Sequence, residues 1–550
     1  MRIIAGSAKG RQLKAPKGDE ITRPTTDKVR EAIFGALQFE IPQSRVLDLF
    51  AGSGAMGIEA LSRGADFAVF VDADRAAAAL VRQNLKAFGM QEQAQVLQMD
   101  YNSALRCLHQ TFDFIFLDPP YHAGLYQPAI EAIIELELLA PGGKIVVEHE
   151  EEVIRAADWI VDIGPKAGYN GGEVVFSGTL PQLLKSRKSL TADYLTGRRE
   201  IAVPTTERGW SNSITVKGAR ENNLRNIDVR IPLGVMTCIT GVSGSGKSSL
   251  AKGILYPALR RMLYDTGVKP GDFDGLAGDV QLLKSVEMVD QNPIGKSSRS
   301  NPVTYIKAYD EIRKLFSDQP YAQHNGLGAS AFSFNIAGGR CEECQGEGVI
   351  KVSMQFMADV ELVCEACGGR RFRDEVLEVK YRGKSIYDVL EMTVDDAIAF
   401  FGEEEKNATC RRIVERLQPL QDVGLGYIRL GQSSSTLSGG ESQRVKLASF
   451  LTKDSAQGGV MFIFDEPTTG LHFHDISKLL AAFNALIERG HTIVIVEHHM
   501  DIIKCADWVV DLGPEAGTAG GRVVFEGTPR ELEKCPESRT GEFLRLRTKL

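Results

Sequence analysis

The sequence predicts an α/β multidomain protein in which a doubly wound, Rossmann-like domain precedes a phosphate-loop domain with an inserted zinc module. Three observations predict this class. Near the N-terminus, an apolar strand is followed by a glycine turn and a helix (residues 46–62). A second apolar strand is followed by a full phosphate loop (235–248), and two Cys-x-x-Cys pairs come after it (341–367). With 550 residues, the chain has room for three or more domains.

Composition narrows the class of protein. Hydrophobic residues make up 43% and charged residues 25%, as in ordinary globular proteins, and the net charge of −8 limits any nucleic-acid site to a local patch. The chain has no run of eighteen apolar residues and a polar opening, so we expect neither a membrane span nor a signal peptide. The nine cysteines form two Cys-x-x-Cys pairs and five singles, which suits a reducing cytoplasm.

Polar residues end four successive apolar strands in the N-terminal part. The first strand, Val46–Leu49, contains Asp48 and leads into a turn with Gly52, Gly54 and Gly57, an opening typical of dinucleotide-type folds. The next strand ends in Asp72, where a carboxylate can accept ribose hydroxyls. The third and fourth strands end in Asp100 and Asp118.

The fourth strand is followed by Asp118-Pro119-Pro120-Tyr121. Prolines have no amide donor, so the carbonyls and Asp118 are left as acceptors, which suits an exocyclic amino group that attacks a methyl donor. Tyr121 could stack on an extruded base. The alternative is an ordinary turn in which Asp118 caps a helix.

These residues, with "RPTTDKVREAIF" (23–34) and "DLFAGSGAMGIEAL" (48–61), resemble the 16S ribosomal RNA guanine-N2 methyltransferase family from Met1 to about Glu150. The resemblance implies that S-adenosylmethionine binds near Asp48, Gly52, Gly54, Asp72 and Asp100, that Asp118–Tyr121 hold a guanine amino group, and that ribosomal RNA is a partner. The family's final antiparallel strand pair is missing. Residues 158–164 and 172–178 could pair onto the open sheet edge in its place.

An internal repeat begins where that resemblance ends. Residues 146–179 align without gaps to residues 495–528, and over half of the positions are identical, including His149 with His498 and Trp159 with Trp508. The first copy has no phosphate loop or acidic strand before it. We therefore interpret it as the orphan tail of an earlier ATPase domain, joined either by a true fusion or by a cloning, assembly or recombination accident.

Four motifs in the C-terminal part suit ATP chemistry. The phosphate loop Gly241–Ser248 offers backbone amides and Lys247 to the phosphates. The strand Met461–Phe464 ends in Asp465, which with Ser248 can hold Mg²⁺, and in Glu466, which can activate water. The segment Leu437–Glu441 begins a helix whose small residues admit phosphate oxygens, and His498 ends another apolar strand.

These motifs resemble the ATP-binding-cassette family and, within it, the UvrA family of nucleotide excision repair, from about Glu148 to the C-terminus. The resemblance implies that Gln291 senses the nucleotide, that damaged double-stranded DNA and other excision-repair proteins are partners, and that two chains form a homodimer with composite sites. The nucleotide-contacting candidates are Gly241, Gly244, Gly246, Lys247, Ser248, Ser249, Gln291, Ser438, Gly439, Gly440 and Asp465, with Lys247, Glu466 and His498 as catalytic residues.

Two cysteine pairs about twenty residues apart bracket a hairpin-like stretch: Cys341 with Cys344, and Cys364 with Cys367. Four thiolates with this spacing favour a structural Zn²⁺ site with no open position, and disulfides or free thiols are the alternative. Nearby Lys351, Arg370, Arg371 and Arg373 suit either DNA phosphates or plain solvation.

The predicted domains are residues 1–150 (methyltransferase-like), 151–213 (orphan tail and linker) and 214–550 (ATPase, with the zinc insertion at about 330–375). The expected function is ATP hydrolysis in DNA-damage recognition, fused to a methyltransferase-like domain. The alternatives are a non-catalytic DNA-binding or interaction protein, and a non-physiological chimera in which neither site is complete.

Overall fold

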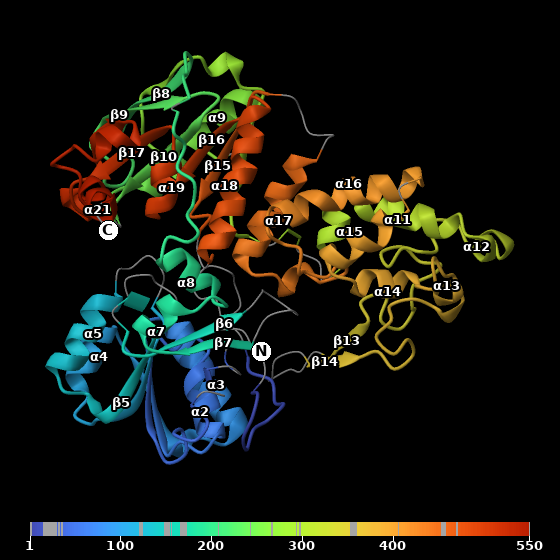
Figure 1. The fold of residues 1–550 in the computed structure, drawn as a ribbon, viewed down its shortest axis with the longest axis horizontal. Helices are drawn as coiled ribbons and strands as arrows, with labels where there is room; N and C mark the ends of the chain where they lie inside the picture. The colour runs from blue at the N-terminus through green and yellow to red at the C-terminus, as the bar shows by residue number, and fades with distance from the viewer. Residues whose placement is uncertain are drawn as a thin grey trace. The chain divides into compact units, whose positions relative to one another are not determined.

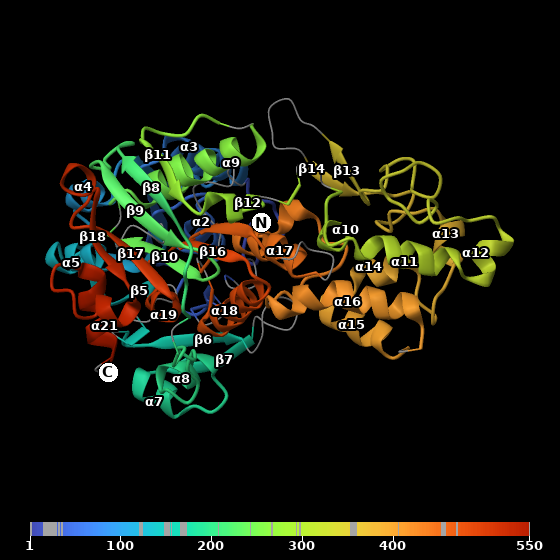
Figure 2. The ribbon, with the colours of Figure 1, turned by 90° about the horizontal axis from the view of Figure 1, so that it is seen from above.

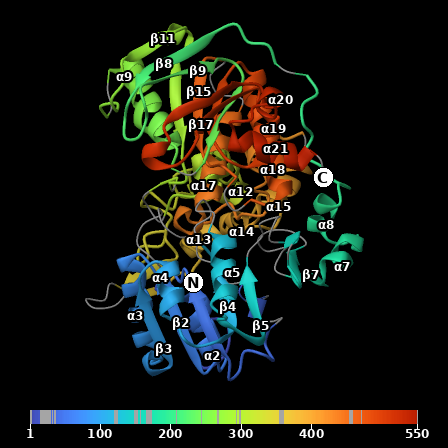
Figure 3. The ribbon, with the colours of Figure 1, turned by 90° about the vertical axis from the view of Figure 1, so that its left-hand side faces the viewer.

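The computed structural model of the chain is shown in Figures 1 to 3. It describes the chain apart from residues 1–2, 15–29, 31–32, 35–36, 120–124, 148–153, 156, 165–172, 207, 243, 266–267, 293, 296–298, 353–359, 405, 453–457, 469–470 and 549–550. The chain divides into two compact units, Met1–Glu200 and Ile201–Leu550. In the described part of the chain, no helix combines the length and apolar character needed to cross a membrane.

Unit 1 contains the predicted doubly wound sheet (Figure 3). All neighbouring strands are parallel, in the order β3-β2-β1-β4-β5. Their bounds are β1 Arg45–Leu49, β2 Phe67–Asp72, β3 Ala94–Gln98, β4 Phe112–Leu117 and β5 Leu139–Val147. Because β1 lies between β2 and β4, the carboxyl ends of these three strands meet at the point where the strand order reverses, which is where doubly wound sheets bind ligands.

Helices cover both faces of this sheet. Alternate residues of β1 divide between two cores: Val46 packs with residues of α2 and α3, and Leu47 with residues of α4 and α5. Successive side chains of a strand point to opposite faces, so a strand buried on both sides reads as an unbroken apolar run. The helix bounds are α2 Ala55–Ser62, α3 Arg75–Phe88, α4 Tyr101–Cys107 and α5 Tyr126–Glu135, and the 3₁₀ turn η1 spans Gln91–Gln93.

The two segments that could have completed this sheet do not join it. The strands β6 (Ile160–Gly164) and β7 (Glu173–Gly178) pair with each other as a separate antiparallel sheet, and β5 remains the edge of the five-stranded sheet among the described strands. The hairpin instead packs against two short helices, α7 (Leu180–Lys185) and α8 (Leu190–Leu195). The expectation of a repaired sheet edge was therefore wrong, because the hairpin's apolar residues already have a core of their own.

That hairpin reproduces the end of unit 2 residue by residue. The strands β17 (Trp508–Gly513) and β18 (Arg522–Gly527) have the same register, with a bulge between Asp511 and Leu512 where β6 has one between Asp162 and Ile163. The likeness continues past the end of the sequence repeat. Ser189 and Thr191 donate to Asp162 just as Ser538 and Thr540 donate to Asp511.

Unit 2 is built on a six-stranded sheet in the order β12-β15-β16-β10-β17-β18, in which only β18 is antiparallel to its neighbour. The remaining bounds are β10 Met236–Gly241, β12 Ser285–Val289, β15 Val460–Asp465 and β16 Thr492–Val496. A second, antiparallel sheet, β11-β8-β9, consists of β8 Ser213–Ala219, β9 Ile227–Pro232 and β11 Gly275–Gly278.

The large sheet lies between two cores. One face packs with the small sheet, the π-helix η3 (Ser249–Leu255) and α9 (Tyr256–Tyr264). The other packs with helices that follow the insertion, α17 (Gly439–Leu451), α18 (Phe473–Glu488) and α19 (Met500–Cys505). The chain closes with α20 (Pro529–Leu532) and α21 (Arg539–Thr548), and short 3₁₀ turns lie at Val280–Leu282, Ser434–Thr436 and Gly517–Ala519.

Helices of the insertion extend this second core away from the sheet (Figure 2). Two strands, β13 (Val349–Val352) and β14 (Val360–Val363), form the predicted hairpin. The helices are α10 Pro302–Tyr305, α11 Ala308–Ser317, α12 Pro320–His324, α13 Asp374–Glu378, α14 Ile386–Glu391, α15 Val394–Gly402 and α16 Ala408–Asp422.

Candidate functional sites

The phosphate loop follows β10 and lies at the carboxyl edge of the large sheet. Glycines at its turns have positive φ (Gly241 +127°, Gly244 +75°, Gly246 +109°), and a Cβ on Gly241 would stand 1.9 Å from the Leu512 carbonyl oxygen. Only glycine fits such a close approach in this backbone conformation. The loop can therefore fold tightly enough to direct its amides at an anion. Ser243 lies outside the described residues.

Two polar groups of this loop suit a phosphate. The Ser245 side chain is fully buried, and its Oγ has no hydrogen-bond partner among the described residues. Lys247 donates from Nζ to the carbonyls of Gly241 (2.8 Å) and Val242 (3.0 Å). Burial lowers the pKa of Lys247, while Glu466 and Asp511 oppose that shift. A phosphate would provide both groups with stronger partners than they now have.

The two predicted carboxylates lie at the end of β15, two strands from β10. Asp465 Oδ2 is 2.5 Å from Nζ of Lys252, a residue that the sequence had not suggested. Glu466 has φ of +46°, uncommon for a residue with a side chain, and its amide donates to Val496 of β16 at 2.9 Å. Positive φ at a non-glycine residue costs on the order of 1–3 kcal/mol and is common where a side chain must be aimed.

Glutamine side chains hold this strand end from the side of β12. Gln291 donates to the Glu466 carbonyl at 3.3 Å. Gln443 lies on helix α17, which begins within the segment Leu437–Glu441, here called the signature segment. Its side chain is buried and donates to the carbonyls of Val289 (2.7 Å) and Asp465 (3.4 Å). The predicted nucleotide-sensing Gln291 therefore contacts the backbone of the predicted catalytic residue Glu466, and helix α17 is bonded to the same strand end through Gln443.

His498 follows β16 by two residues, and its position depends on Glu497, which sequence reasoning missed. Glu497 is fully buried and accepts from the amides of His498 (2.6 Å) and His499 (3.0 Å) and from the amide (3.1 Å) and hydroxyl of Thr468. Burial opposes its ionisation, but the two histidines and these hydrogen bonds outweigh burial and lower the pKa of Glu497. The only signal was a carboxylate in an otherwise apolar strand end.

The signature segment begins helix α17 as predicted. Ser438 is the N-cap, its Oγ accepts from the Glu441 amide (3.2 Å), and Glu441 Oε2 accepts from the Ser438 amide (2.7 Å). The other oxygen of Glu441 accepts from the Tyr427 hydroxyl at 2.5 Å. A Cβ on Gly439 would stand 2.9 Å from Cβ of Gln291, so the helix start needs a small residue there.

The four predicted cysteines converge. All four sulfurs lie within 4.8 Å of one another, with Cys341 and Cys364 at 3.8 Å and Cys344 and Cys367 at 3.7 Å. Tetrahedral ligands about 2.3 Å from a zinc ion would be separated by about 3.8 Å. The residues therefore fit a four-thiolate metal, and the thiols form no disulfide. The Gly348 amide also donates to Cys344 Sγ (3.3 Å), a typical bond to a metal-bound sulfur.

In unit 1, Asp48 and Asp72 brace the glycine turn. The Gly57 amide donates to Asp48 (2.9 Å), and the Gly52 amide donates to Asp72 (2.8 Å). Gly52 and Gly54 both have positive φ (+54° and +76°). Burial, with smaller effects of Asp118 and Asp72, raises the pKa of Asp48 to about 7, and burial also raises the pKa of Asp72.

The other predicted residues of unit 1 differ in their surroundings. Asp118 follows β4 next to β1, close enough to affect the pKa of Asp48. Asp100 is exposed and caps helix α4 through Ser103 (3.0 Å). Pro119 is buried, whereas Pro120, Tyr121 and His149 lie outside the described residues.

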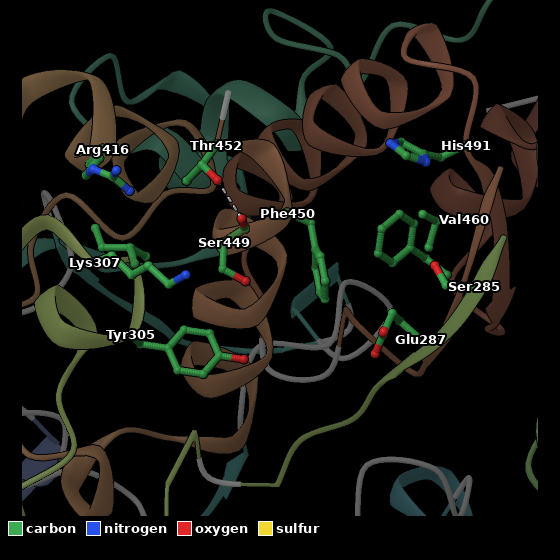
Figure 4. Close-up of a pocket in the computed structure, with 12 residues that line it drawn as sticks. Ser285, Glu287, Tyr305, Lys307, Arg416, Ser449, Phe450, Thr452, Val460 and His491 are labelled. Atoms are coloured by element: carbon green, nitrogen blue, oxygen red, sulfur yellow. Dashed lines mark hydrogen bonds between the residues drawn. The ribbon is translucent and has the colours of Figure 1, made fainter. Parts of the chain in front are cut away.

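Unit 2 also contains a cavity of about 370 Å³ that none of the predicted residues lines. It lies between β12, β15, α17 and the insertion segments at residues 305–307 and Arg416 (Figure 4). His491 is buried beside it, and its Nδ1 has no hydrogen-bond partner among the described residues. Burial lowers the pKa of His491.

Comparison with known proteins identifies both segments. The sequence family described as "Conserved hypothetical protein 95" matches residues 1–170. "UvrABC system protein A" of Streptomyces avermitilis is 51% identical over 434 residues (78% of this chain, 42% of that protein), and that of Clostridium perfringens 49% identical over 433 residues (78% and 45%). The crystal structure of UvrA2 from Deinococcus radiodurans superimposes with a TM-score of 0.72 at 41% identity, over 86% of this chain and 58% of that one.

These matches confirm both resemblances seen in the sequence. The chain spans less than half the length of the curated relatives named above. The N-terminal family match ends at residue 170, inside the internal repeat that begins at residue 146, so the two resemblances overlap there. The chain thus joins a segment that matches the family "Conserved hypothetical protein 95" to a longer segment similar to UvrABC system protein A.

Proposed function

We propose that unit 2 binds and hydrolyses ATP as part of a DNA-damage recognition protein of nucleotide excision repair. The observation that carries this proposal is the meeting of the phosphate loop, Asp465, Glu466 and Gln291 around one sheet edge, held by hydrogen bonds between neighbouring strands. The similarity to UvrABC system protein A over 434 residues supports it.

In this proposal each residue has one task. Lys247 exchanges the Gly241 and Val242 carbonyls for β- and γ-phosphate oxygens, and Ser245 and the loop amides bind the same anion. Ser248 and Asp465 would hold Mg²⁺, which would neutralise phosphate charge. Glu466 polarises the attacking water, and Glu497 fixes the backbone from which His498 reaches the γ-phosphate. The side-chain oxygens of Ser248 and Asp465 are the kind of ligand that magnesium prefers. The buried Ser245 hydroxyl, which has no partner among the described residues, could donate to a phosphate.

ATP hydrolysis by the full chain tests the proposal. Lys247→Ala is expected to abolish nucleotide binding. Glu466→Gln is expected to keep binding but to lower kcat by about 10²- to 10⁴-fold, because only water activation is lost. Lys217→Met, which breaks an exposed ion pair with Asp228, is the control. Unchanged kcat in Glu466→Gln contradicts the assignment, and an inactive parent protein favours the non-catalytic alternative.

We also propose that the four-cysteine cluster holds one structural Zn²⁺ and that the basic residues flanking it contact DNA phosphates. Arg370 and Arg373 now pair with Asp374 and Glu342, so they need new partners before they can bind phosphates. Elemental analysis of the purified chain is expected to find one zinc per chain, and well under one equivalent with intact thiols contradicts this. Damaged double-stranded DNA is the expected ligand, with other excision-repair proteins and a second copy of the chain as protein partners.

A second candidate function belongs to unit 1, where we propose binding of S-adenosylmethionine. The buried Asp48, with its pKa of about 7, is a carboxyl group that a cationic ligand would ionise. Asp72, which accepts from the Gly52 amide, would accept the ribose hydroxyls. Asp118 and the prolines after it would hold a guanine amino group of ribosomal RNA. Calorimetry is expected to detect S-adenosylmethionine binding that Asp72→Ala abolishes, and no binding by the parent chain contradicts the proposal.

A further inference from the structure

Lys252 makes a contact that the proposed ATPase function does not require. Its Nζ lies 2.5 Å from Oδ2 of Asp465, the carboxylate proposed to hold Mg²⁺ with Ser248. Lys252 is four residues after Ser248, on the helix that leaves the phosphate loop. Side chains on a helix lean toward its N-terminus, so the ammonium group is directed back to the phosphate-binding end.

The helix has an unusual form at this point. Residues Ser249–Leu255 form a π-helix rather than an α-helix. Such segments are rare and occur frequently at functional sites, because the extra residue per turn changes the face on which a side chain emerges. The carbonyl of Gly253, inside the segment, accepts a hydrogen bond from the amide of Gly271, which lies outside the helix (2.8 Å). Leu250, Ala251, Ile254 and Leu255 of the same segment are buried in the core, so the backbone that carries Lys252 is anchored.

The ion pair has one fixed and one movable partner. Asp465 ends a buried strand, its side chain is 18% exposed, and its carbonyl accepts from Gln443 (3.4 Å). The Lys252 side chain is 46% exposed, so the ammonium can exchange the carboxylate for water. A divalent ion placed beside Ser248 and Asp465 would repel that ammonium and compete for the same oxygen. The metal must therefore displace Lys252.

We propose that Lys252 is a tethered cation that competes with Mg²⁺ for Asp465. The contact keeps the metal off the nucleotide-free site and sets the concentration at which the nucleotide-loaded domain acquires it. This inference rests on the proposed ATP site and concerns how that site is loaded. Lys247, held on two carbonyl oxygens of the loop, makes no such contact with Asp465 in the described structure, so the competition belongs to Lys252.

Metal binding without turnover tests the inference. Mn²⁺ serves as the probe, and its affinity for the ADP-loaded full chain is measured by electron paramagnetic resonance. Lys252→Met is expected to tighten Mn²⁺ binding about five- to tenfold, because the competing cation is gone. Lys252→Arg keeps the charge and is expected to show no tightening. Lys217→Met, which removes a surface ion pair elsewhere in the unit, is the matched control.

A fluorescent ADP analogue in excess EDTA separates the ways in which the test can fail. Nucleotide binding with unchanged Mn²⁺ affinity in Lys252→Met overturns this inference alone. Weaker metal-free ADP binding in Lys252→Met without tighter Mn²⁺ binding makes Lys252 a phosphate ligand and also overturns the competition. Absence of nucleotide binding by the parent chain overturns the proposed ATP site, and this inference with it.

Discussion

Single side chains in both units sit in states that a bound ligand would change. Lys247 and Lys252 lie on protein oxygens, Ser245 has a buried hydroxyl without a described partner, and Asp48 is a buried carboxyl with a raised pKa. The buried hydroxyl and the buried carboxyl lower the stability of the protein alone, and the two lysines contact oxygens that a phosphate or a metal ion would replace. Such residues mark where binding energy is available.

Asp48 makes this testable through pH. Its pKa is about 7 in the folded chain and 3.8 in the unfolded one, so between these values the folded state holds a proton that the unfolded state has lost. Stability of unit 1 is therefore expected to fall as pH rises from about 4 to 7, and Asp48→Asn is expected to remove the part of that fall that Asp48 causes, while the raised pKa of Asp72 leaves a smaller part. At pH 8 the variant should be more stable by at most about 4 kcal/mol.

Pulse proteolysis in urea, following unit 1 fragments by mass spectrometry at pH 5.5 and pH 8, measures this difference. Asp113→Asn is the control, because Asp113 is a more exposed acceptor for the Arg45 amide in the same unit. If Asp48→Asn destabilises unit 1 at pH 8, the bond from Gly57 matters more than the burial of charge.

At the scale of elements, the two copies of the repeat provide an internal comparison. Helices α8 and α21 are both capped by a serine that also donates to an aspartate of the preceding hairpin. The surroundings differ, because β17 pairs with β10 on its other side, whereas β6 pairs only with β7 among the described strands. As a result Asp511 is buried and Asp162 is half-buried.

We expect Asp511→Ala to cost about 2–4 kcal/mol and Asp162→Ala about 1 kcal/mol. Each change leaves two buried hydroxyls without their acceptor, but water can replace the half-buried Asp162 carboxylate more easily than the buried Asp511 carboxylate. Hydrogen–deuterium exchange mass spectrometry localises each loss. Exchange should rise in residues 508–545 for the first variant and in 160–196 for the second. The conservative variants Asp511→Asn and Asp162→Asn should each retain part of the stability that the alanine variant loses. Equal losses in the two alanine variants would contradict the role of burial.

For the whole molecule, the proposed ATP site raises the question of how many chains complete it. Helix α17, with the signature residues, packs with α16, α18 and β12, whereas the phosphate loop follows β10 on the far side of β15 and β16 (Figures 1 and 2). We propose that the signature helix of a second chain closes the site, in a two-fold dimer with two identical sites.

Mixing two inactive variants tests this arrangement. In a heterodimer of Lys247→Ala and Ser438→Arg chains, one site carries both changes and the other carries none. An equal mixture should therefore recover about a quarter of the parent ATPase activity. Ser438→Ala, which removes the cap without adding bulk, controls for misfolding of α17. No recovery, or a concentration-independent activity from a monomer measured by light scattering, contradicts the dimer.

The sequence by itself determined those features that are encoded over a few neighbouring residues. Glycine spacing predicted the phosphate loop and the turn after β1, apolar runs predicted β1 to β4, β10, β15 and β16, and cysteine spacing predicted the four-cysteine cluster. These signals are reliable because backbone sterics and strand periodicity act locally.

Only the tertiary structure decided which distant segments meet. It paired β6 with β7 instead of the open sheet edge, extended the repeat through Ser189 and Thr191 beyond the sequence alignment, and brought Lys252 to Asp465 and Glu497 to Thr468. The side-chain contacts among these join residues from 27 to more than 200 positions apart. No spacing rule encodes such contacts, because each depends on which surfaces bury the most apolar area and satisfy the most polar groups when the whole chain packs.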